Sequence, residues 1–134
     1  MKNMSITSEE NTPTVIIADD SPEIVMVLKK TLEVCDCNVV ATAEDGEQAI
    51  ELIHQHKPDM VFLDIEMPNK NGFDVLDAIK NSKLKIFSVM VSGHSSKENL
   101  TASLKRGVQG FIVKPHNQKK VEEVVASYLV SLNK

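Results

Sequence analysis

Four short runs of mostly apolar residues divide the chain at regular intervals. They cover residues 15–18, 60–63, 86–91 and 111–113, and a weaker fifth run lies at 38–42. Continuous apolar runs of this length are typical of strands that are covered on both faces, as in a parallel sheet. We therefore predict five strands, with the weaker run 38–42 at an edge of the sheet.

Between these runs, apolar residues recur at helical spacing. The first helix is predicted to begin after Ser21, an N-cap residue that is followed by Pro22 at the first helical position. Its buried face is expected to consist of Ile24, Val25, Val27, Leu28 and Leu32. This pattern predicts an amphipathic helix packed against the sheet.

Four more helices are predicted in the same way. One ends before Pro58, another opens at Gly72, and a third begins in a capping box from Ser95 to Glu98 and stops at Gly107. The last carries a single apolar stripe made of Val121, Val124, Val125, Tyr128, Leu129 and Leu132. Strand and helix thus alternate five times.

This alternation predicts an α/β fold with a doubly wound, open parallel sheet and right-handed crossovers. The length of 134 residues suits one domain. Residues 1–12 are mainly polar and show no period, so we expect a flexible tail there and a folded domain over 13–134, without a separate output domain. In such a fold, ligands bind at the carboxyl ends of the strands.

Charge and hydropathy narrow the classes of function. The chain has 15 basic and 19 acidic residues, a net charge of −4, which is the wrong sign for a nucleic-acid binder. No apolar run approaches the roughly 20 residues that span a bilayer, and no signal sequence is evident, so a cytoplasmic protein is expected. Cys35 and Cys37 are expected to be reduced thiols rather than a strained disulfide.

Polar residues follow directly on four of the apolar runs. They are Asp19, Asp20, Asp64, Ser92 and Lys114. Because these positions meet at one edge of a parallel sheet, three carboxylates should lie close together and repel one another unless a cation intervenes. Mg²⁺, or Mn²⁺ in its place, suits such oxygen ligands, while an ammonium and a hydroxyl suit phosphoryl oxygens. The set predicts phosphoryl-transfer chemistry.

The same residues carry a family resemblance. Residues 15–21, 61–68 with Gly72, 89–93 and 110–115 resemble the receiver domain of two-component response regulators. The resemblance covers about residues 13 to 132, and its motifs are specific in combination. It implies a flavodoxin-like fold with strand order 2-1-3-4-5 and five flanking helices.

The resemblance also implies a role for each acidic residue. Asp64 matches the phosphoacceptor, which takes a phosphoryl group from a sensor histidine kinase or a histidine phosphotransfer protein. Asp19 and Asp20 match the pair that binds Mg²⁺ together with Asp64 and the backbone carbonyl of Glu66. Apart from accepting the phosphoryl group and slowly losing it, such a domain is not an enzyme.

Two further positions match the signalling switch. Ser92 and Lys114 match the groups that contact the bound phosphoryl, and Phe111 matches the aromatic position that turns inward when Ser92 is drawn to the phosphate. The family's readout surface implies a downstream protein partner on the fourth helix, fifth strand and fifth helix. The resemblance also suggests a cis peptide between Lys114 and Pro115.

Two variable positions flank the expected site. Glu66 lies two residues after Asp64, and His94 lies two residues after Ser92. We hypothesise that both flank the path of hydrolytic water and set the lifetime of the phosphoryl group.

Three functions remain open at this point. The first is a stand-alone receiver that acts through a partner, and the second is a receiver fold that works as a phosphorylation-independent adaptor. The third is a haloacid-dehalogenase-like phosphatase, suggested by Asp64-Ile65-Glu66 after a strand, although the expected Asp-x-Asp on the first strand is missing.

Other signals have ordinary explanations. His54 and His56 lie in the last turn of a predicted helix, where the helix dipole favours cations. Lys80, Lys83 and Lys85 are expected to form a solvated patch rather than a docking site.

Overall fold

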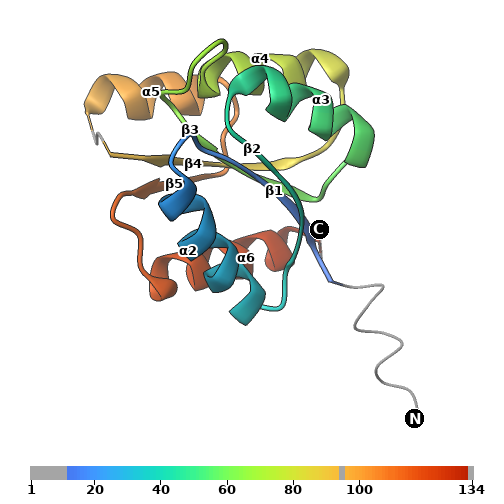
Figure 1. Cartoon of the computed structure of the whole chain (residues 1–134), viewed down its shortest axis with the longest axis vertical. Helices are drawn as coiled ribbons and strands as arrows, with labels where there is room; N and C mark the ends of the chain where they lie inside the picture. The colour runs from blue at the N-terminus through green and yellow to red at the C-terminus, as the bar shows by residue number, and fades with distance from the viewer. Residues whose placement is uncertain (1–11, 94–95, 133–134) are drawn as a thin grey trace.

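The computed structural model describes residues 12–93 and 96–132, in which strands and helices alternate (Figure 1). The strands are β1 (Thr14–Ala18), β2 (Asn38–Ala43), β3 (Met60–Asp64), β4 (Phe87–Ser92) and β5 (Gly110–Val113). The helices are α2 (Pro22–Val34), α3 (Gly46–His56), α4 (Gly72–Ser82), α5 (Lys97–Lys105) and α6 (Gln118–Ser131). Within the described residues, no helix combines the length and apolar character needed to cross a membrane.

The five strands form one parallel sheet in the order β2-β1-β3-β4-β5. This confirms the doubly wound architecture and the edge position of residues 38–42. The chain moves outward from β1 to β2 and then returns to the other side of β1 at β3. The carboxyl ends of β1 and β3 therefore flank the point where the winding reverses, where α/β sheets bind ligands.

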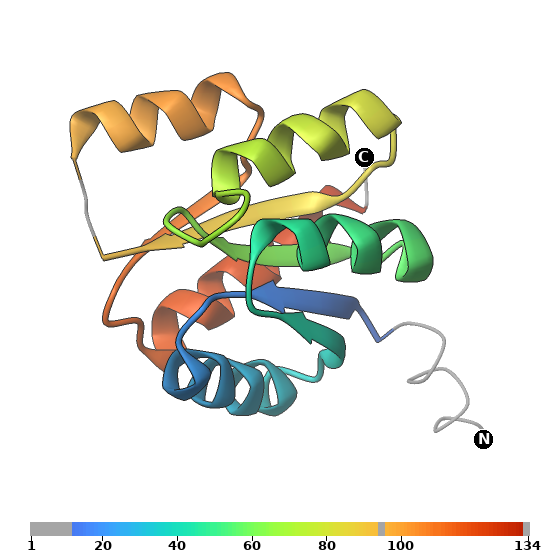
Figure 2. The same cartoon turned by 45° about the horizontal axis from the view of Figure 1, so that its top comes forward.

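Helices cover both faces of the sheet. Helices α3 and α4 lie on one face and α2 and α6 on the other, as Figures 1 and 2 show. Successive strand residues alternate between the two cores, so that Ile16 and Leu63 pack toward α3 and α4, whereas Ile17 and Phe62 pack toward α2 and α6. Burial on both faces is the reason why the strands read as continuous apolar runs.

Helix α5 is attached to the domain much more loosely. Among its residues only Ser103 is buried, while Leu104 is 60% exposed. Its carboxyl end is held by Arg106, whose side chain lies 3.2 Å from Asp77 and stacks 4.8 Å above the ring of Phe73. This helix therefore rests on α4 through a polar contact rather than a shared apolar core.

The helix starts agree with the predicted caps in one case and differ in another. Ser21 caps α2 by accepting a hydrogen bond from the amide of Ile24, and Pro22 is the first helical residue, as predicted. The cap of α5 is Ser96, which accepts from the amide of Asn99, so the predicted capping box from Ser95 to Glu98 is wrong. The helix begins one residue later than expected, and Ser95 itself lies outside the described residues.

The predicted apolar faces of α2 and α6 are too wide. Val27, Leu129 and Leu132 are exposed, although the pattern assigned them to the core. The two helices lie on the same face of the sheet and contact it through narrow stripes. The stripes consist of Leu28 and Leu32 on α2 and of Val121, Val125 and Tyr128 on α6. Val25 and Val124, beside these stripes, are partly buried and pack against the same core.

We predict that Gly72→Ala destabilises the domain by about 2 kcal/mol, because a Cβ at this position would collide with the carbonyl oxygen of Asp64 and lie 3.1 Å from the Cα of Ile65. Gly93→Ala is the matched control, since a Cβ there would have no neighbour within 4 Å among the described residues. Urea unfolding of both variants measures the difference. Equal midpoints for the two would contradict the close approach seen at Gly72.

Candidate functional site

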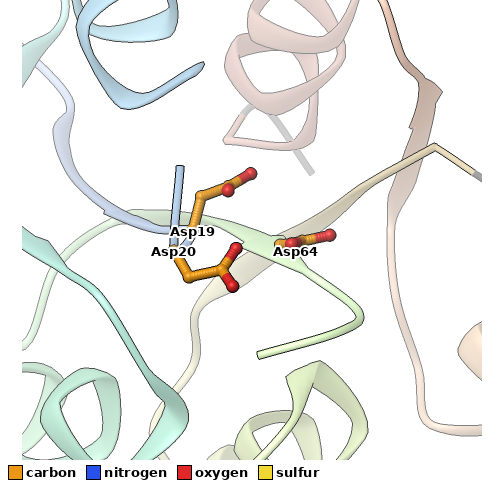
Figure 3. Close-up of side chains that lie close together, drawn as sticks. All are labelled: Asp19, Asp20 and Asp64. Atoms are coloured by element: carbon orange, nitrogen blue, oxygen red, sulfur yellow. The ribbon is translucent and has the colours of Figure 1, made fainter. Parts of the chain in front are cut away.

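Three aspartates meet where the sheet changes direction. Asp19 and Asp20 follow β1 directly, and Asp64 is the last residue of β3. Because β1 and β3 are parallel neighbours with Ala18 opposite Leu63, their carboxyl ends lie side by side. One carboxylate oxygen from each aspartate lies within 4.8 Å of the others, and Figure 3 shows the three side chains grouped together.

The three carboxylates differ in their surroundings. Asp19 and Asp64 are only 3% and 8% exposed, whereas Asp20 is open to solvent. The buried Asp19 carboxylate accepts a hydrogen bond of 2.9 Å from the amide of Ser21 at the start of α2. Asp19 is thus fixed by the backbone, while Asp20 stays free to approach a ligand from the solvent side.

Lys114 supplies the positive charge of the site. Its Nζ lies 2.9 Å from Oδ2 of Asp19 and 3.4 Å from Oδ1 of Asp64. The residue follows β5, and its amide donates to the carbonyl of Ser92 at the end of β4. The peptide bond between Lys114 and Pro115 is cis, as the resemblance suggested. The ammonium group thus joins residues from two strands that are not adjacent to β5.

The charges within the site are not balanced. Burial, and then the charge of Asp19, raise the pKa of Asp64, although Lys114 opposes this shift. Burial lowers the pKa of Lys114, but its contacts with Asp19 and Asp64 outweigh that effect, and the net pKa is raised. One ammonium therefore faces three carboxylates that gain stability from any additional cation.

An open cavity of about 760 Å³ lies above Asp64. Ser92 lines it from the end of β4, Glu66 from the loop after β3, and Asn99 from α5. Asp20, Asp64 and Lys114 line the same cavity. A phosphoryl-sized group can therefore approach an oxygen of Asp64 with a hydroxyl and an ammonium nearby.

The loop between β3 and α4 is held by contacts that sequence reasoning missed. Asn69 donates a hydrogen bond of 2.7 Å to Asp45, which also caps α3 through the amide of Gln48. These hydrogen bonds lower the pKa of Asp45. The sequence signal was the Asp45-Gly46 pair before a helix, which identifies a cap but not its long-range partner. Through this contact α3 positions the segment that contains Glu66.

Of the remaining predicted residues, the structure describes Phe111 and Ser92 but not His94. Phe111 is half-buried in β5 and packs against the core that lies under α3 and α4. Ser92 is buried at the carboxyl end of β4. His94 lies outside the described residues.

The donor set fits a divalent cation. Carboxylate oxygens are hard ligands, and Mg²⁺ commonly takes one or two carboxylates and keeps several waters. Asp20 and Asp64 both line the open cavity, so that water and an incoming anion have access to the same place. The three aspartates therefore form a group that can hold a metal ion.

Comparison with known proteins now decides the family. The model of the response regulator receiver domain matches residues 15–126. The chain belongs to the response regulator receiver domain family. The phosphatase alternative rested only on Asp64-Ile65-Glu66 after a strand, and the family match does not support it.

Relatives of the receiver differ in length. The chemotaxis protein CheY of Bacillus subtilis is 33% identical over 111 residues, which cover 83% of this chain and 92% of CheY. The probable C4-dicarboxylate response regulator DctR of the same species is 32% identical over 85% of this chain. The receiver spans about half the length of DctR (51%) and of the nitrate/nitrite regulator NarL of Escherichia coli (50%).

Solved structures confirm the fold of the receiver. CheY in the CheX-CheY-BeF3-Mg²⁺ complex of Borrelia burgdorferi superimposes with a TM-score of 0.84 at 31% identity, over 90% of this chain and 92% of that one. The receiver domain of NarL from Mycobacterium tuberculosis gives a TM-score of 0.82 at 29% identity, over 87% and 94%. The flavodoxin-like order 2-1-3-4-5 is thus shared with known receivers.

We predict that Asp64→Asn makes the receiver more stable at neutral pH in the presence of a chelator, by on the order of 1 kcal/mol. The substitution removes one buried negative charge and leaves Lys114 paired with Asp19. Folding raises the pKa of Asp64, which means that the charged carboxylate destabilises the folded state. This destabilisation develops as the pH rises above the ordinary pKa of 3.8. Urea unfolding should show the gain at pH 7 and a smaller difference near pH 3.5. A less stable variant at pH 7 would mean that the pairing with Lys114 outweighs the repulsion.

Proposed function

We propose that this receiver accepts a phosphoryl group on Asp64 from a sensor histidine kinase or a histidine phosphotransfer protein and signals through phosphorylation-dependent binding of a protein partner. The observation that carries this proposal is the placement of Asp64. Its carboxylate lies at the base of an open cavity, 3.4 Å from the ammonium of Lys114 and beside two more aspartates.

The reaction needs a carboxylate nucleophile and neutralisation of charge. An oxygen of Asp64 attacks phosphorus while the bond from phosphorus to the histidine nitrogen breaks, and the nitrogen leaves with the electron pair of that bond. In this proposal Lys114 neutralises an equatorial phosphoryl oxygen, and the hydroxyl of Ser92 donates a hydrogen bond to another. Contacts with Asp19 and Asp64 raise the pKa of Lys114, so the ammonium is charged before the phosphoryl group arrives.

The proposed metal ligands are Asp19, Asp20, Asp64 and the backbone carbonyl of Glu66. When bound, Mg²⁺ or Mn²⁺ supplies positive charge that offsets the repulsion between the carboxylates and the phosphoryl group. Asp19 is held by the amide of Ser21, so its orientation is set before any ligand arrives. The Borrelia burgdorferi relative was solved with BeF3 and Mg²⁺, which supports a magnesium site in this receiver.

The proposed switch couples Ser92 to Phe111. A Ser92 hydroxyl drawn toward the phosphoryl group leaves room that the half-buried ring of Phe111 can enter. Helix α5 follows the β4 end and is loosely packed, so little apolar contact opposes its displacement. Moving such an equilibrium from 1:99 to 99:1 takes about 5.5 kcal/mol, within reach of an ion pair and hydrogen bonds shielded from water.

The proposed readout surface is formed by α5, β5 and α6. Leu100, Leu104 and Val113 are exposed on its elements. The relative solved together with CheX supports partner binding by a receiver of this kind. That this receiver works without an output domain stays a prediction, and so does the adaptor alternative.

We predict that acetyl phosphate with Mg²⁺ adds one phosphoryl group to the purified receiver, detected by intact mass. Asp64→Ala and a chelator should each abolish the adduct. Lys114→Met and Ser92→Ala should retain the acceptor but lower the rate of labelling by roughly tenfold or more, because each removes a contact to the transferred group. Lys29→Met is the matched control, since this exposed lysine lies on α2.

The same experiment separates the alternatives. An adduct on Asp64→Ala would place the acceptor elsewhere. No adduct on the wild-type receiver, together with no binding of a fluoroberyllate analogue, would favour the phosphorylation-independent adaptor.

We propose that Glu66 and His94 set the phosphoryl lifetime. Replacing both with alanine should change the rate of dephosphorylation by several-fold, because under this hypothesis both side chains flank the path of water to phosphorus. The decay of the labelled receiver after removal of acetyl phosphate measures this rate. An unchanged rate would contradict the proposed role of Glu66 and His94 but not that of Asp64.

A further inference from the structure

A second cavity lies at the opposite end of the strands from Asp64. It has a volume of about 650 Å³, within the range of known binding sites. The starts of β4 and β5 line it, with residues Ser88 and Gln109, and so do the carboxyl ends of α4, α5 and α6. None of the residues proposed for phosphorylation reaches this cavity.

The polar groups deep in this cavity already have partners. The amide of Ser88 donates to the side-chain oxygen of Gln109 at 2.8 Å, and the Ser88 hydroxyl donates to the carbonyl of Ile86. Asp59 accepts hydrogen bonds from the amide and the hydroxyl of Thr14. The rest of the wall is mainly apolar, with Leu76, Ile79, Leu84, Leu104 and Leu132. The interior therefore offers a place for an apolar group rather than a set of converging hydrogen-bond donors.

The rim of the cavity is positively charged. Lys80, Lys85 and Lys105 line it, and none of them forms an ion pair within residues 12–93 and 96–132. Arg106 also lines it, but its guanidinium is engaged by Asp77. In a chain with a net charge of −4, this local excess of cations attracts negatively charged partners.

The position of the lysines is not explained by helix capping alone. Lys80 and Lys105 lie in the last turns of α4 and α5, where a cation interacts favourably with the helix dipole. Lys85, however, lies between α4 and β4 and belongs to no helix. Its exposed side chain has no such role, yet it faces the same cavity.

We propose that this cavity, with Lys80, Lys85 and Lys105 at its rim, is a docking site for an acidic segment of a partner protein that inserts an apolar side chain. The leucine-lined interior takes the apolar group, and the unpaired ammonium groups take flanking carboxylates. This goes beyond the proposed phosphoryl transfer and does not depend on it. The sequence pattern predicted that Lys80, Lys83 and Lys85 form a solvated patch. In this proposal Lys80 and Lys85 belong to the docking site, and only Lys83 of the three lies outside the cavity wall.

A displayed peptide library tests the proposal. Each twelve-residue member carries two leucines among four or more glutamates or aspartates at varied positions, and selection is carried out on the 134-residue chain. We expect enriched peptides whose affinity falls at least tenfold for the triple variant Lys80→Gln, Lys85→Gln, Lys105→Gln. Raising the salt concentration should weaken the same peptides, because the rim charges are exposed.

Matched controls separate this site from general charge attraction. The variant Lys29→Gln, Lys30→Gln, Lys119→Gln removes three exposed lysines elsewhere and should keep full affinity. Leu104→Asn changes an exposed residue of the cavity wall and should weaken binding severalfold. Thermal unfolding of each variant shows that the fold is retained.

The proposal is overturned if no peptide is enriched on the wild-type receiver over the triple variant, or if both triple variants lose affinity equally. It is also overturned if peptides with serine in place of leucine bind as well, since the cavity would then contribute nothing. Labelling by acetyl phosphate should be unchanged in the triple variant Lys80→Gln, Lys85→Gln, Lys105→Gln, so that failure of one proposal is not mistaken for failure of the other.

Discussion

The contact of the Lys114 ammonium with Asp19 and Asp64 is the interaction on which the candidate site depends. It ties the end of β5 to the ends of β1 and β3, although β5 is not a neighbour of either strand in the sheet. It also neutralises only part of the charge, because a third carboxylate, Asp20, lies within 4.8 Å of the other two. The folded receiver is thus prepared for a further cation and for an anion that competes for the lysine.

The two ends of the sheet have opposite electrostatic characters. Aspartates gather at the carboxyl ends of the strands, whereas lysines that form no ion pair with any described residue surround the cavity at the amino ends. The doubly wound fold makes this separation possible, since every helix returns the chain from one end of the sheet to the other. The aspartate site and the lysine-rimmed cavity therefore lie at opposite ends of one small domain.

The uneven packing of the helices bears on how a signal leaves the site. Helices α3 and α4 share an apolar core with the sheet, and α3 also holds the loop after Asp64 through Asp45 and Asn69. Helix α5 depends instead on Arg106 and its contacts with Phe73 and Asp77. A partly exposed ion pair of this kind contributes little to stability, so α5 is held by less apolar contact than α3 and α4.

Local patterns in the sequence determined the order of the strands and helices, the cap at Ser21, and the identity of the polar residues that follow each strand. These features depend on residues that are close together in the sequence, so apolar runs and capping residues predict them. The widths of the buried helix faces were not determined in this way, since Val27 and Leu129 are exposed although they lie on the apolar side of the helical pattern. The choice of Ser96 as the N-cap of α5 was not determined in this way either. Only the tertiary structure brought Lys114 to Asp19, Asn69 to Asp45, and three lysines to one cavity, because such contacts join residues far apart in sequence whose distances are fixed by packing alone.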